Sequence, residues 1–226
     1  YLTTMIYQKT LDYLFSQLPV FQKEGATAYK PGLETAEKLD AWLHHPHRQY
    51  ACLHIAGTNG KGSVSHLTAS VLQAAGLRTG LFTSPHLKDF RERMRVNGAM
   101  ISEADVIDFV TRYRQQWEGR LQASFFEVTT MMAFEWFARE SVDVAVIEVG
   151  LGGRLDTTNI ITPTACAITN RDGESYGSIH VCTLDGLLYP DILFSAVKQR
   201  AWFVRYVLAL RINLFRRIFL YEKIFT

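Results

Sequence analysis

The sequence lacks several features that mark specialised classes of protein. It has only three cysteines, Cys52, Cys166 and Cys182, with neither a C-x-x-C motif nor metal-site spacing. Such sparse use is typical of reduced thiols in a cytoplasmic protein. No charged-then-apolar leader with a small-residue cleavage site opens the chain. Charges also interrupt the long apolar runs well short of a membrane span. We therefore expect a cytoplasmic location.

A large excess of charge of one sign is also missing. The formal net charge is +2 over 226 residues, which gives no general attraction for nucleic acid or other polyanions. Apolar side chains, in contrast, make up 48% of the residues and suffice for a buried core. The length suits one domain or one and a half. The chain opens at Tyr1 rather than at methionine, as expected of a fragment.

The most informative segment runs from Ile55 to Ser63 and reads I-A-G-T-N-G-K-G-S. An apolar run at 52–56 precedes it, and a helix-like pattern at 64–75 follows it. Strand, glycine turn, lysine and helix together are typical of a nucleotide phosphate site, because backbone N–H groups, a helix amino terminus and an ammonium group all attract an anion. The common pattern G-x-x-x-x-G-K-[ST] is not matched, since Ile55 replaces its first glycine and Gly62 its Ser/Thr. An ordinary Gly/Asn turn is the alternative.

Short strands and helices alternate along the rest of residues 1–170. Periodicity predicts helices at 4–18, 35–43, 64–75, 106–117 and 126–140, and strands at 52–56, 78–83, 143–149 and 164–169. Ser102 is the expected N-cap of one helix. Residues 22–34 and 85–100 are expected to be loops, the second with a turn signal at Asn97-Gly98. The alternation predicts an α/β fold, a mostly parallel sheet with helices on both faces.

In such folds, ligands bind beyond the carboxyl ends of the strands. The phosphate loop, Ser84 and Glu148 all lie at or just past predicted strand ends. A carboxylate in the apolar run around Glu148 is costly unless it is paired or binds a cation. We interpret Glu148 as a Mg²⁺ ligand beside the phosphates. The alternative is an acid paired with Arg154 or with a backbone amide.

Four segments, in order, resemble one family. They are Gly57 to Ser63, Thr83-Ser84-Pro85-His86-Leu87, the E-R-M-R-V-N-G of 92–98, and the E-V-G-L-G-G-R-L-D-T-T-N of 148–159. Residues 1–170 thereby resemble dihydrofolate synthase/folylpolyglutamate synthase, a member of the Mur ligase superfamily whose phosphate loop reads G-T-x-G-K-G-S.

The resemblance implies a Mur-ligase-type ATP-binding domain and an ATP-dependent ligase with Mg²⁺ as its second cofactor. In that family ATP phosphorylates an acceptor carboxylate, and the amine of L-glutamate attacks the resulting acyl phosphate. The acceptor would be dihydropteroate, folate or both. The implied partners are these small molecules, with no nucleic acid, and the implied state is a monomer.

The resemblance also assigns roles to individual residues. Lys61 would be the catalytic residue, and Ser84 and Glu148 would ligate Mg²⁺, although Ser84 taken alone reads as a turn-capping hydroxyl. The ATP-binding residues would be Gly57, Thr58, Asn59, Gly60, Lys61, Gly62 and Ser63. The substrate residues would be Phe126, Thr129, Arg154 and Asp156.

The sequence leaves two interpretations open for Phe126 and for a group of three arginines. Phe126 either stacks on a flat heterocycle or packs in the helix core. The alternating Arg91, Arg93 and Arg95 form either a solvated edge or a site near an anionic substrate. A third group, His44, His45 and His47, shows no metal-ligand spacing and is expected at an exposed helix end.

The resemblance stops after Asn170. The family continues with an Ile-Gly-x-Asp-His segment whose histidine completes the metal site, whereas this chain reads R-D-G-E-S, with Ser175 in place of the histidine. The family's downstream lysine segment and its C-terminal domain have no counterpart in the sequence. Residues 171–226 are therefore expected to be a divergent tail, interpreted as an altered reading frame or a truncated product.

Two alternatives remain for that tail, a basic amphipathic membrane helix and a segment that recognises a partner. The arginines of 199–226 do not keep to one helical face, which disfavours membrane contact. With the family's metal and domain contacts missing, we expect weak ATP binding and little ligase turnover. The competing functions are a non-enzymatic nucleotide-binding remnant and another Mur-type ligase acting on cell-wall precursors.

Overall fold

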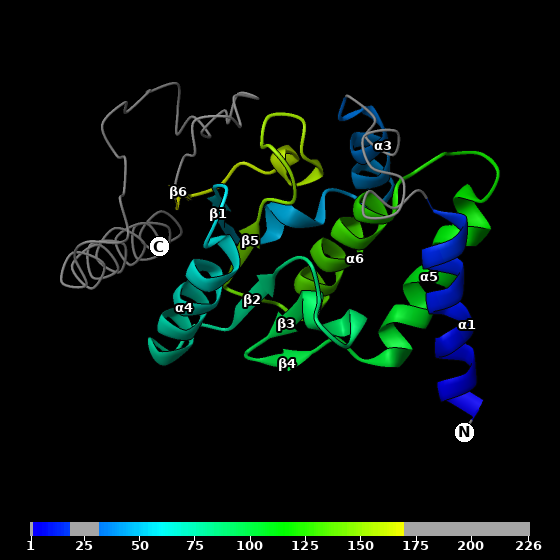
Figure 1. The fold of residues 1–226 in the computed structure, drawn as a ribbon, viewed down its shortest axis with the longest axis horizontal. Helices are drawn as coiled ribbons and strands as arrows, with labels where there is room; N and C mark the ends of the chain where they lie inside the picture. Colours follow the sequence, from blue (N-terminus) through cyan, green and yellow to red (C-terminus); the bar gives the residue numbers. More distant parts are fainter. Residues whose placement is uncertain (1, 19–31, 170–226) are drawn as a thin grey trace, which may run out of the picture.

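In the computed structural model, residues 2–18 and 32–169 are described, and they form a mostly parallel sheet with helices on both faces (Figure 1). The helices are α1 (Leu2–Gln17), α3 (Glu34–Trp42), α4 (Lys61–Ala74), α5 (Glu103–Trp117) and α6 (Phe125–Arg139). The strands are β1 (Ala51–Ala56), β2 (Thr79–Phe82), β3 (Met94–Val96), β4 (Ala99–Met100), β5 (Val144–Glu148) and β6 (Ala165–Ile168). Short 3-10 helices lie at η2 (Pro46–Gln49), η3 (Phe90–Arg93) and η4 (Thr157–Ile160).

The six strands lie in the order β4-β3-β2-β5-β1-β6. The four strands β2, β5, β1 and β6 are parallel, while β3 runs antiparallel to β2 and β4 antiparallel to β3. Ile55 of β1 pairs with Glu148 of β5, so the segment after β1 starts beside the end of β5. The predicted fold class is confirmed.

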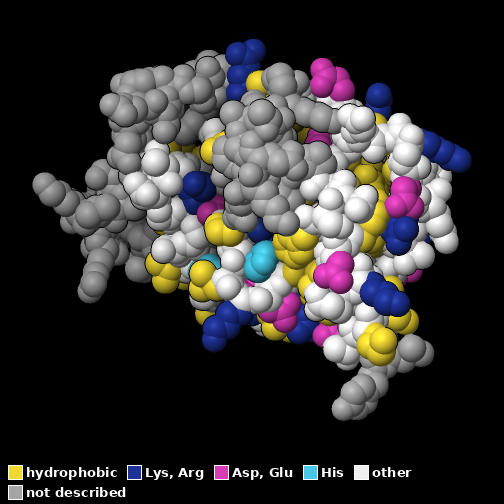
Figure 2. Space-filling model, turned by 45° about the vertical axis from the view of Figure 1, so that its right-hand side comes forward, with side chains coloured by type: hydrophobic (Ala, Val, Ile, Leu, Met, Phe, Trp, Pro, Cys, Tyr) yellow, Lys and Arg dark blue, Asp and Glu magenta, His cyan; other side chains and the backbone are white. Residues whose placement is uncertain are grey.

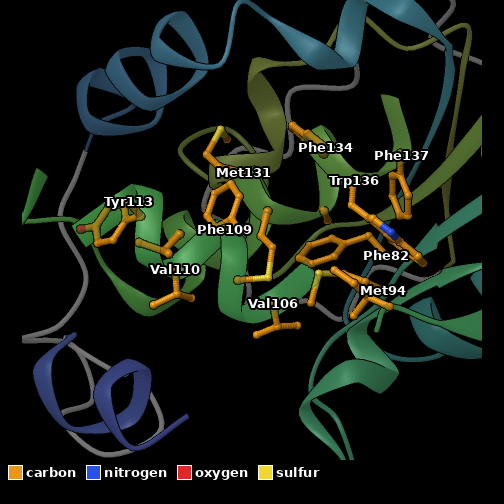
Figure 3. Packing of buried hydrophobic residues seen from close by; sticks show 14 of the residues in the cluster. Phe82, Met94, Val106, Phe109, Val110, Tyr113, Met131, Phe134, Trp136 and Phe137 are labelled. Atoms are coloured by element: carbon orange, nitrogen blue, oxygen red, sulfur yellow. The ribbon is translucent and has the colours of Figure 1, made fainter. Parts of the chain in front are cut away.

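Alternation along the strands divides the core between the two faces of the sheet. On β5, Val144 and Val146 pack in the cluster that contains residues of α4, whereas Ala145 and Ile147 belong to the larger cluster with α5 and α6. Figure 3 shows side chains of α5 and α6 filling this larger cluster next to β2 and β3. Its largest fully buried members include Phe82, Phe109, Tyr113, Phe134 and Phe137.

Helix starts agree with their capping signals. The Ser102 hydroxyl accepts a hydrogen bond from the N–H of Asp105 at 3.0 Å, which confirms the predicted N-cap of α5. In α6, the Ser124 hydroxyl accepts from the N–H of Glu127, and the Glu127 carboxylate accepts from the N–H of Ser124 at 2.7 Å. This reciprocal capping box fixes the start of the helix that carries Phe126.

The predicted loop at 85–100 is wrong. This segment contains η3 and the β3–β4 hairpin, whose strands have only three and two residues, too few to show a period in the sequence. The turn signal inside it is confirmed, since Asn97 and Gly98 join the strands with φ of 49° and 81°. Asn-Gly suits such a turn because both residues tolerate positive φ. The other predicted elements agree with the observed bounds to within three residues.

Several segments with a predicted structure are not among the described residues. Most of the predicted loop at 22–34, the R-D-G-E-S segment of 171–175 and the tail to 226 lie outside the described residues. Within the described part, none of the helices is both long and apolar enough to cross a bilayer. Figure 2 shows acidic and basic side chains interspersed over one face of that part, as the small net charge suggests.

Replacing Ser124 by alanine should destabilise the protein by about 0.5–2 kcal/mol, because the N-cap hydroxyl of α6 is lost. Urea unfolding of the 226-residue chain measures this difference. Ser70→Ala is the matched control, since Ser70 is exposed within α4 and its hydroxyl donates to the carbonyl of His66 in the preceding turn. Equal stability of the two variants would contradict the capping role of Ser124.

Candidate functional site

Three connections meet at the carboxyl-terminal edge of the parallel strands. The glycine loop follows β1, Ser84 follows β2, and Glu148 ends β5. The N–H of Ser84 donates to Oε2 of Glu148 at 2.9 Å. A Cβ added to Gly62, at the start of α4, would lie 3.7 Å from Oε1 of the same carboxylate. The structure therefore brings together the phosphate loop, Ser84 and Glu148, three of the elements that the sequence placed at this edge.

The loop leads into α4 through a left-handed residue. Gly60 is the N-cap with a φ of 80°, a conformation that favours glycine. Helix α4 then begins at Lys61, three residues before the predicted start, so Lys61, Gly62 and Ser63 form its first turn. N–H groups in the first turn of a helix have no intrahelical acceptor and make an anion site together with the helix dipole. The local geometry thus suits a phosphate group.

The Lys61 ammonium group lies over the same loop. Its Nζ donates to the carbonyl of Gly57 at 2.8 Å and to that of Thr58 at 3.4 Å. On the other side, the Thr169 hydroxyl, just past β6, donates to the carbonyl of Asn59 at 2.5 Å. Contacts from α4 and from the end of β6 therefore hold the loop in place.

Glu148 is a buried carboxylate, with 3% of its surface exposed. Burial raises its pKa above the ordinary value, and the hydrogen bond from Ser84 and the charges of Lys61 and Arg93 only partly offset that effect. The alternative of a backbone-amide partner is thus observed at one oxygen, while Arg154 is exposed and forms no ion pair with Glu148. A buried carboxylate that is not fully compensated favours a bound cation.

Arg93 lies beneath this site. It is 4% exposed, its Nε donates to Nδ1 of His86 at 2.8 Å, and its guanidinium lies 5.2 Å from the centre of the Phe125 ring. Burial lowers its pKa to about 10, although Glu148 opposes the shift. The solvated-edge interpretation is therefore wrong for Arg93, whereas Arg91 is half-buried and pairs with Asp89 at 2.7 Å. Arg95 is half-buried and donates to the carbonyl of Gly98.

A hydrogen-bond network orders the turn after β5. The Asp156 carboxylate accepts from the N–H of Leu151 at 2.8 Å and from the N–H and hydroxyl of Thr158 at 3.0 and 2.5 Å. Thr158 also bonds to Nε2 of His54, a buried residue of β1, at 2.8 Å. Because the Thr158 hydroxyl donates to Asp156, the His54 ring nitrogen is the donor in that bond. The network ties the turn to β1, the strand that precedes the phosphate loop.

The structure brings together two of the four predicted substrate residues, since a Cβ added to Gly150 would lie 2.5 Å from Cζ of Phe126 and 2.9 Å from Oδ2 of Asp156. The other two, Thr129 and Arg154, have different surroundings. Thr129 is fully buried and donates to the carbonyl of Phe125 at 2.7 Å, and Asp156 is buried in the network of the turn. Arg154 is exposed. Phe126 packs against Phe82 at the edge of the core and stays half-buried.

Phe126 also determines which residue fits at position 150. A Cβ on Gly150 would lie only 2.5 Å from Cζ of Phe126, so no larger residue fits there without movement of the ring. The ring thus lies beside the end of β5, next to the candidate site.

The expectation of an exposed helix end holds for His44, which is exposed just after α3, but it is wrong for His47. His47 is 6% exposed and lies with His45 and Asp40 in one cluster, rather than on an exposed helix end. Sequence reasoning missed this cluster because the acidic member precedes the histidines on α3. It also missed the burial of Arg93 and the anchoring role of His54. The signal for Arg93 was its position in the 92–98 motif, and the signal for His54 was its position inside an apolar strand.

No family model matches the sequence. A probable bifunctional folylpolyglutamate synthase/dihydropteroate synthase of Halobacterium salinarum is 47% identical over 146 residues, which are 62% of this chain and 18% of that protein. The dihydrofolate synthase/folylpolyglutamate synthase of Bacillus subtilis is 41% identical over 147 residues, 62% of this chain and 34% of that protein. The chain thus spans about a third or less of these relatives.

Solved structures give the same match. The crystal structure of folylpolyglutamate synthase from Thermotoga maritima has a TM-score of 0.64 and 42% identity, covering 74% of this chain and 39% of that one. A bifunctional folylpolyglutamate synthase/dihydrofolate synthase with Mn, AMPPNP and L-glutamate bound has a TM-score of 0.57 and 36% identity, covering 62% of this chain and 34% of that one.

Glu148→Gln should raise the thermal stability of the ligand-free protein at neutral pH. The folded-state pKa of Glu148 is raised, so its favourable contribution exists below the ordinary carboxyl pKa and is lost as pH rises through the folded value. The gain should therefore disappear on acidification below 4.5, the ordinary value. Calorimetry against pH checks this, with the exposed pair member Glu118→Gln as control. A variant less stable than wild type at neutral pH would refute the account.

Proposed function

We propose that this chain, whose described part belongs to the dihydrofolate synthase/folylpolyglutamate synthase family of the Mur ligase superfamily, binds ATP with Mg²⁺ and forms the nucleotide site of a glutamate ligase. The reaction joins L-glutamate to dihydropteroate or folate. The observation that carries the proposal is the meeting of Lys61, Ser84 and Glu148 at one edge of the sheet, at the start of α4.

The phosphates of ATP bind the loop between β1 and α4. The N–H groups of 57–63 surround the β- and γ-phosphates, and the Lys61 ammonium group exchanges its bonds to the carbonyls of Gly57 and Thr58 for phosphate oxygens. Lys61 is the catalytic residue because its charge offsets the negative charge on the transferring phosphoryl group. The related structure with AMPPNP and Mn bound supports the choice of ATP and a divalent ion as ligands.

The donor set at the strand ends suits Mg²⁺. Glu148 offers a carboxylate whose Oε1 faces the side-chain-free Gly62, and Ser84 offers a neighbouring hydroxyl. Mg²⁺ prefers such oxygen ligands and uses few protein ligands together with phosphate oxygens and water. When bound, the ion neutralises phosphate charge; Glu148 and Ser84 hold it beside the loop.

The remaining residues position the substrates. The γ-phosphoryl group passes to a carboxylate of the acceptor, and the amine of glutamate then displaces phosphate from the acyl phosphate. Phe126 presents a half-buried aromatic face near the end of β5, suited to a flat heterocycle. Asp156 orders the turn beside it, with Arg154 exposed at its rim, and Thr129 supports α6 from within the core.

We place this activity in the cytoplasm, since Cys52 and Cys166 form no disulfide among the described residues. The monomeric state is proposed from the family resemblance. The segment-by-segment match favours the folate branch over a ligase of cell-wall precursors. A non-enzymatic nucleotide-binding role remains a distinct outcome of the experiments below.

Lys61→Ala should weaken ATP binding in the presence of Mg²⁺ by about 1.5–3 kcal/mol, the value of a charge-assisted hydrogen bond, which is about ten- to hundredfold in Kd. The fold should survive, because Lys61 is half-buried in the first turn of α4 and belongs to neither hydrophobic cluster of the core. Isothermal titration measures the affinity. Lys88→Ala is the control, since Lys88 is an exposed lysine in the segment after Ser84. Equal binding by both variants would refute the role of the loop.

The substrate assignment is tested by equilibrium binding and by turnover. Dihydropteroate should bind the Mg-ATP-loaded chain more tightly than a UDP-sugar peptide, and preference for the peptide would overturn the folate assignment. Formation of ADP and a glutamylated product should be slow with the 226-residue chain, because Ser175 stands where the family's metal-site histidine is expected. Turnover at a rate typical of intact enzymes would contradict the expected impairment.

A further inference from the structure

A second group of chemically active side chains lies at the opposite end of β1 from the phosphate loop. Asp40 belongs to the last turn of α3, and His45 and His47 follow in the connection to β1. At about 3.3 Å per residue, the two ends of this strand are roughly 17 Å apart. The cluster is therefore separate from the Glu148 site and does not depend on the proposed function.

The three side chains point to a common centre. Nδ1 of His45 lies 2.5 Å and Nε2 of His47 3.3 Å from Oδ2 of Asp40. One ligand atom from each residue lies within 4.8 Å of the others. Ligand atoms around a tetrahedral zinc ion, with bonds of about 2.0–2.1 Å, are roughly 3.3 Å apart. Small side-chain movements are enough to close the three groups around such an ion.

One carboxylate oxygen of the cluster has no hydrogen-bond donor among the described residues. Asp40 is 5% exposed, and its Oδ1 is buried without a hydrogen-bond partner among residues 2–18 and 32–169. A buried carboxylate oxygen without a donor or a cation costs free energy. Mutual hydrogen bonding with the two histidines satisfies only Oδ2, so the direct contacts alone do not account for the arrangement.

The backbone and the packing hold both rings in position. His44 and His45 have φ of 60° and 56°, and this reversal returns the His45 ring over the end of α3. Such a conformation costs about 1–3 kcal/mol for a residue other than glycine. The ring of His47 packs against Phe134 at 5.8 Å between centres. The His45 side chain is 39% exposed, which leaves a path from solvent.

We infer that Asp40, His45 and His47 bind a divalent transition-metal ion, for which Zn²⁺ is the best match. Two imidazole nitrogens and one carboxylate oxygen form a common zinc ligand set, with a fourth position left for water. Mg²⁺ and Ca²⁺ prefer sites made of oxygen alone. The ion ties the end of α3 to the start of β1 and stabilises the folded state by binding only to it.

The test uses the full 226-residue chain after removal of metal with a chelator, titrated with Co²⁺ as a spectroscopic substitute for Zn²⁺ in excess Mg²⁺. His45→Asn removes the half-exposed ligand and keeps a residue that tolerates positive φ. His44→Asn is the matched control, because His44 is the exposed neighbour with the same backbone conformation and lies outside the cluster. Circular dichroism establishes that each variant is folded.

We expect wild type and His44→Asn to bind one Co²⁺ with the intense visible absorption of tetrahedral coordination, and to melt at a higher temperature with Zn²⁺ than with chelator. His45→Asn should lose at least about tenfold in affinity, as expected when a metal site loses a contributing group.

Equal absorption from both variants would place the ion elsewhere and overturn the proposal. Absence of the band in wild type would also overturn it, leaving a metal-free hydrogen-bonded cluster. The nucleotide site is tested independently by ATP titration of Lys61→Ala. A negative result there would leave the Co²⁺ measurement unaffected.

Discussion

The site depends on the burial of one carboxylate. Glu148 ends β5 almost without exposure, where its ionised form is unfavourable unless positive groups face it. The N–H of Ser84, the ammonium group of Lys61 and the guanidinium of Arg93 approach from three other segments and compensate it only in part. In the function that we propose, a divalent ion with phosphate oxygens completes that compensation, and the free energy that burial costs the ligand-free protein is regained when Mg-ATP binds.

The order of the strands produces this meeting. Because β5 lies between β2 and β1, the segments that leave β2 and β1 reach the carboxylate at the end of β5 from its two sides. The contacts that hold these segments in place also come from several parts of the chain. Helix α4 carries the phosphate loop, Thr169 past β6 fixes that loop, and the Asp156 network fixes the turn that follows Glu148. The positions of Lys61, Ser84 and Glu148 therefore depend on segments that are far apart in the sequence. The metal cluster that we infer from Asp40, His45 and His47 reinforces the other end of the same strand, β1, and so supports the site only through the fold.

Local pattern was enough to predict the elements that surround the site. The apolar runs of β1 and β5, the glycines before Lys61 and the cap at Ser102 each act within a few residues, and the structure has them where the sequence indicates. What the sequence did not reveal depends on contacts between distant segments. The short strands β3 and β4 have no period of their own, and the burial of Arg93 follows from packing against Phe125, 32 positions away. The grouping of Asp40 with His47 likewise requires the chain reversal at His44 and His45, which no pattern of side chains announces. Thr129, assigned by resemblance alone, proved to lie in the core.

The most direct measurement of the central claim is a crystal structure of this chain with Mn²⁺ and a non-hydrolysable ATP analogue, with an anomalous difference map to locate the ion. The account predicts one strong anomalous peak within bonding distance of a Glu148 oxygen and of the Ser84 hydroxyl, with the terminal phosphates against Lys61 and the first turn of α4. A triphosphate bound away from this loop, or an ion that contacts neither Glu148 nor the phosphates, would contradict it.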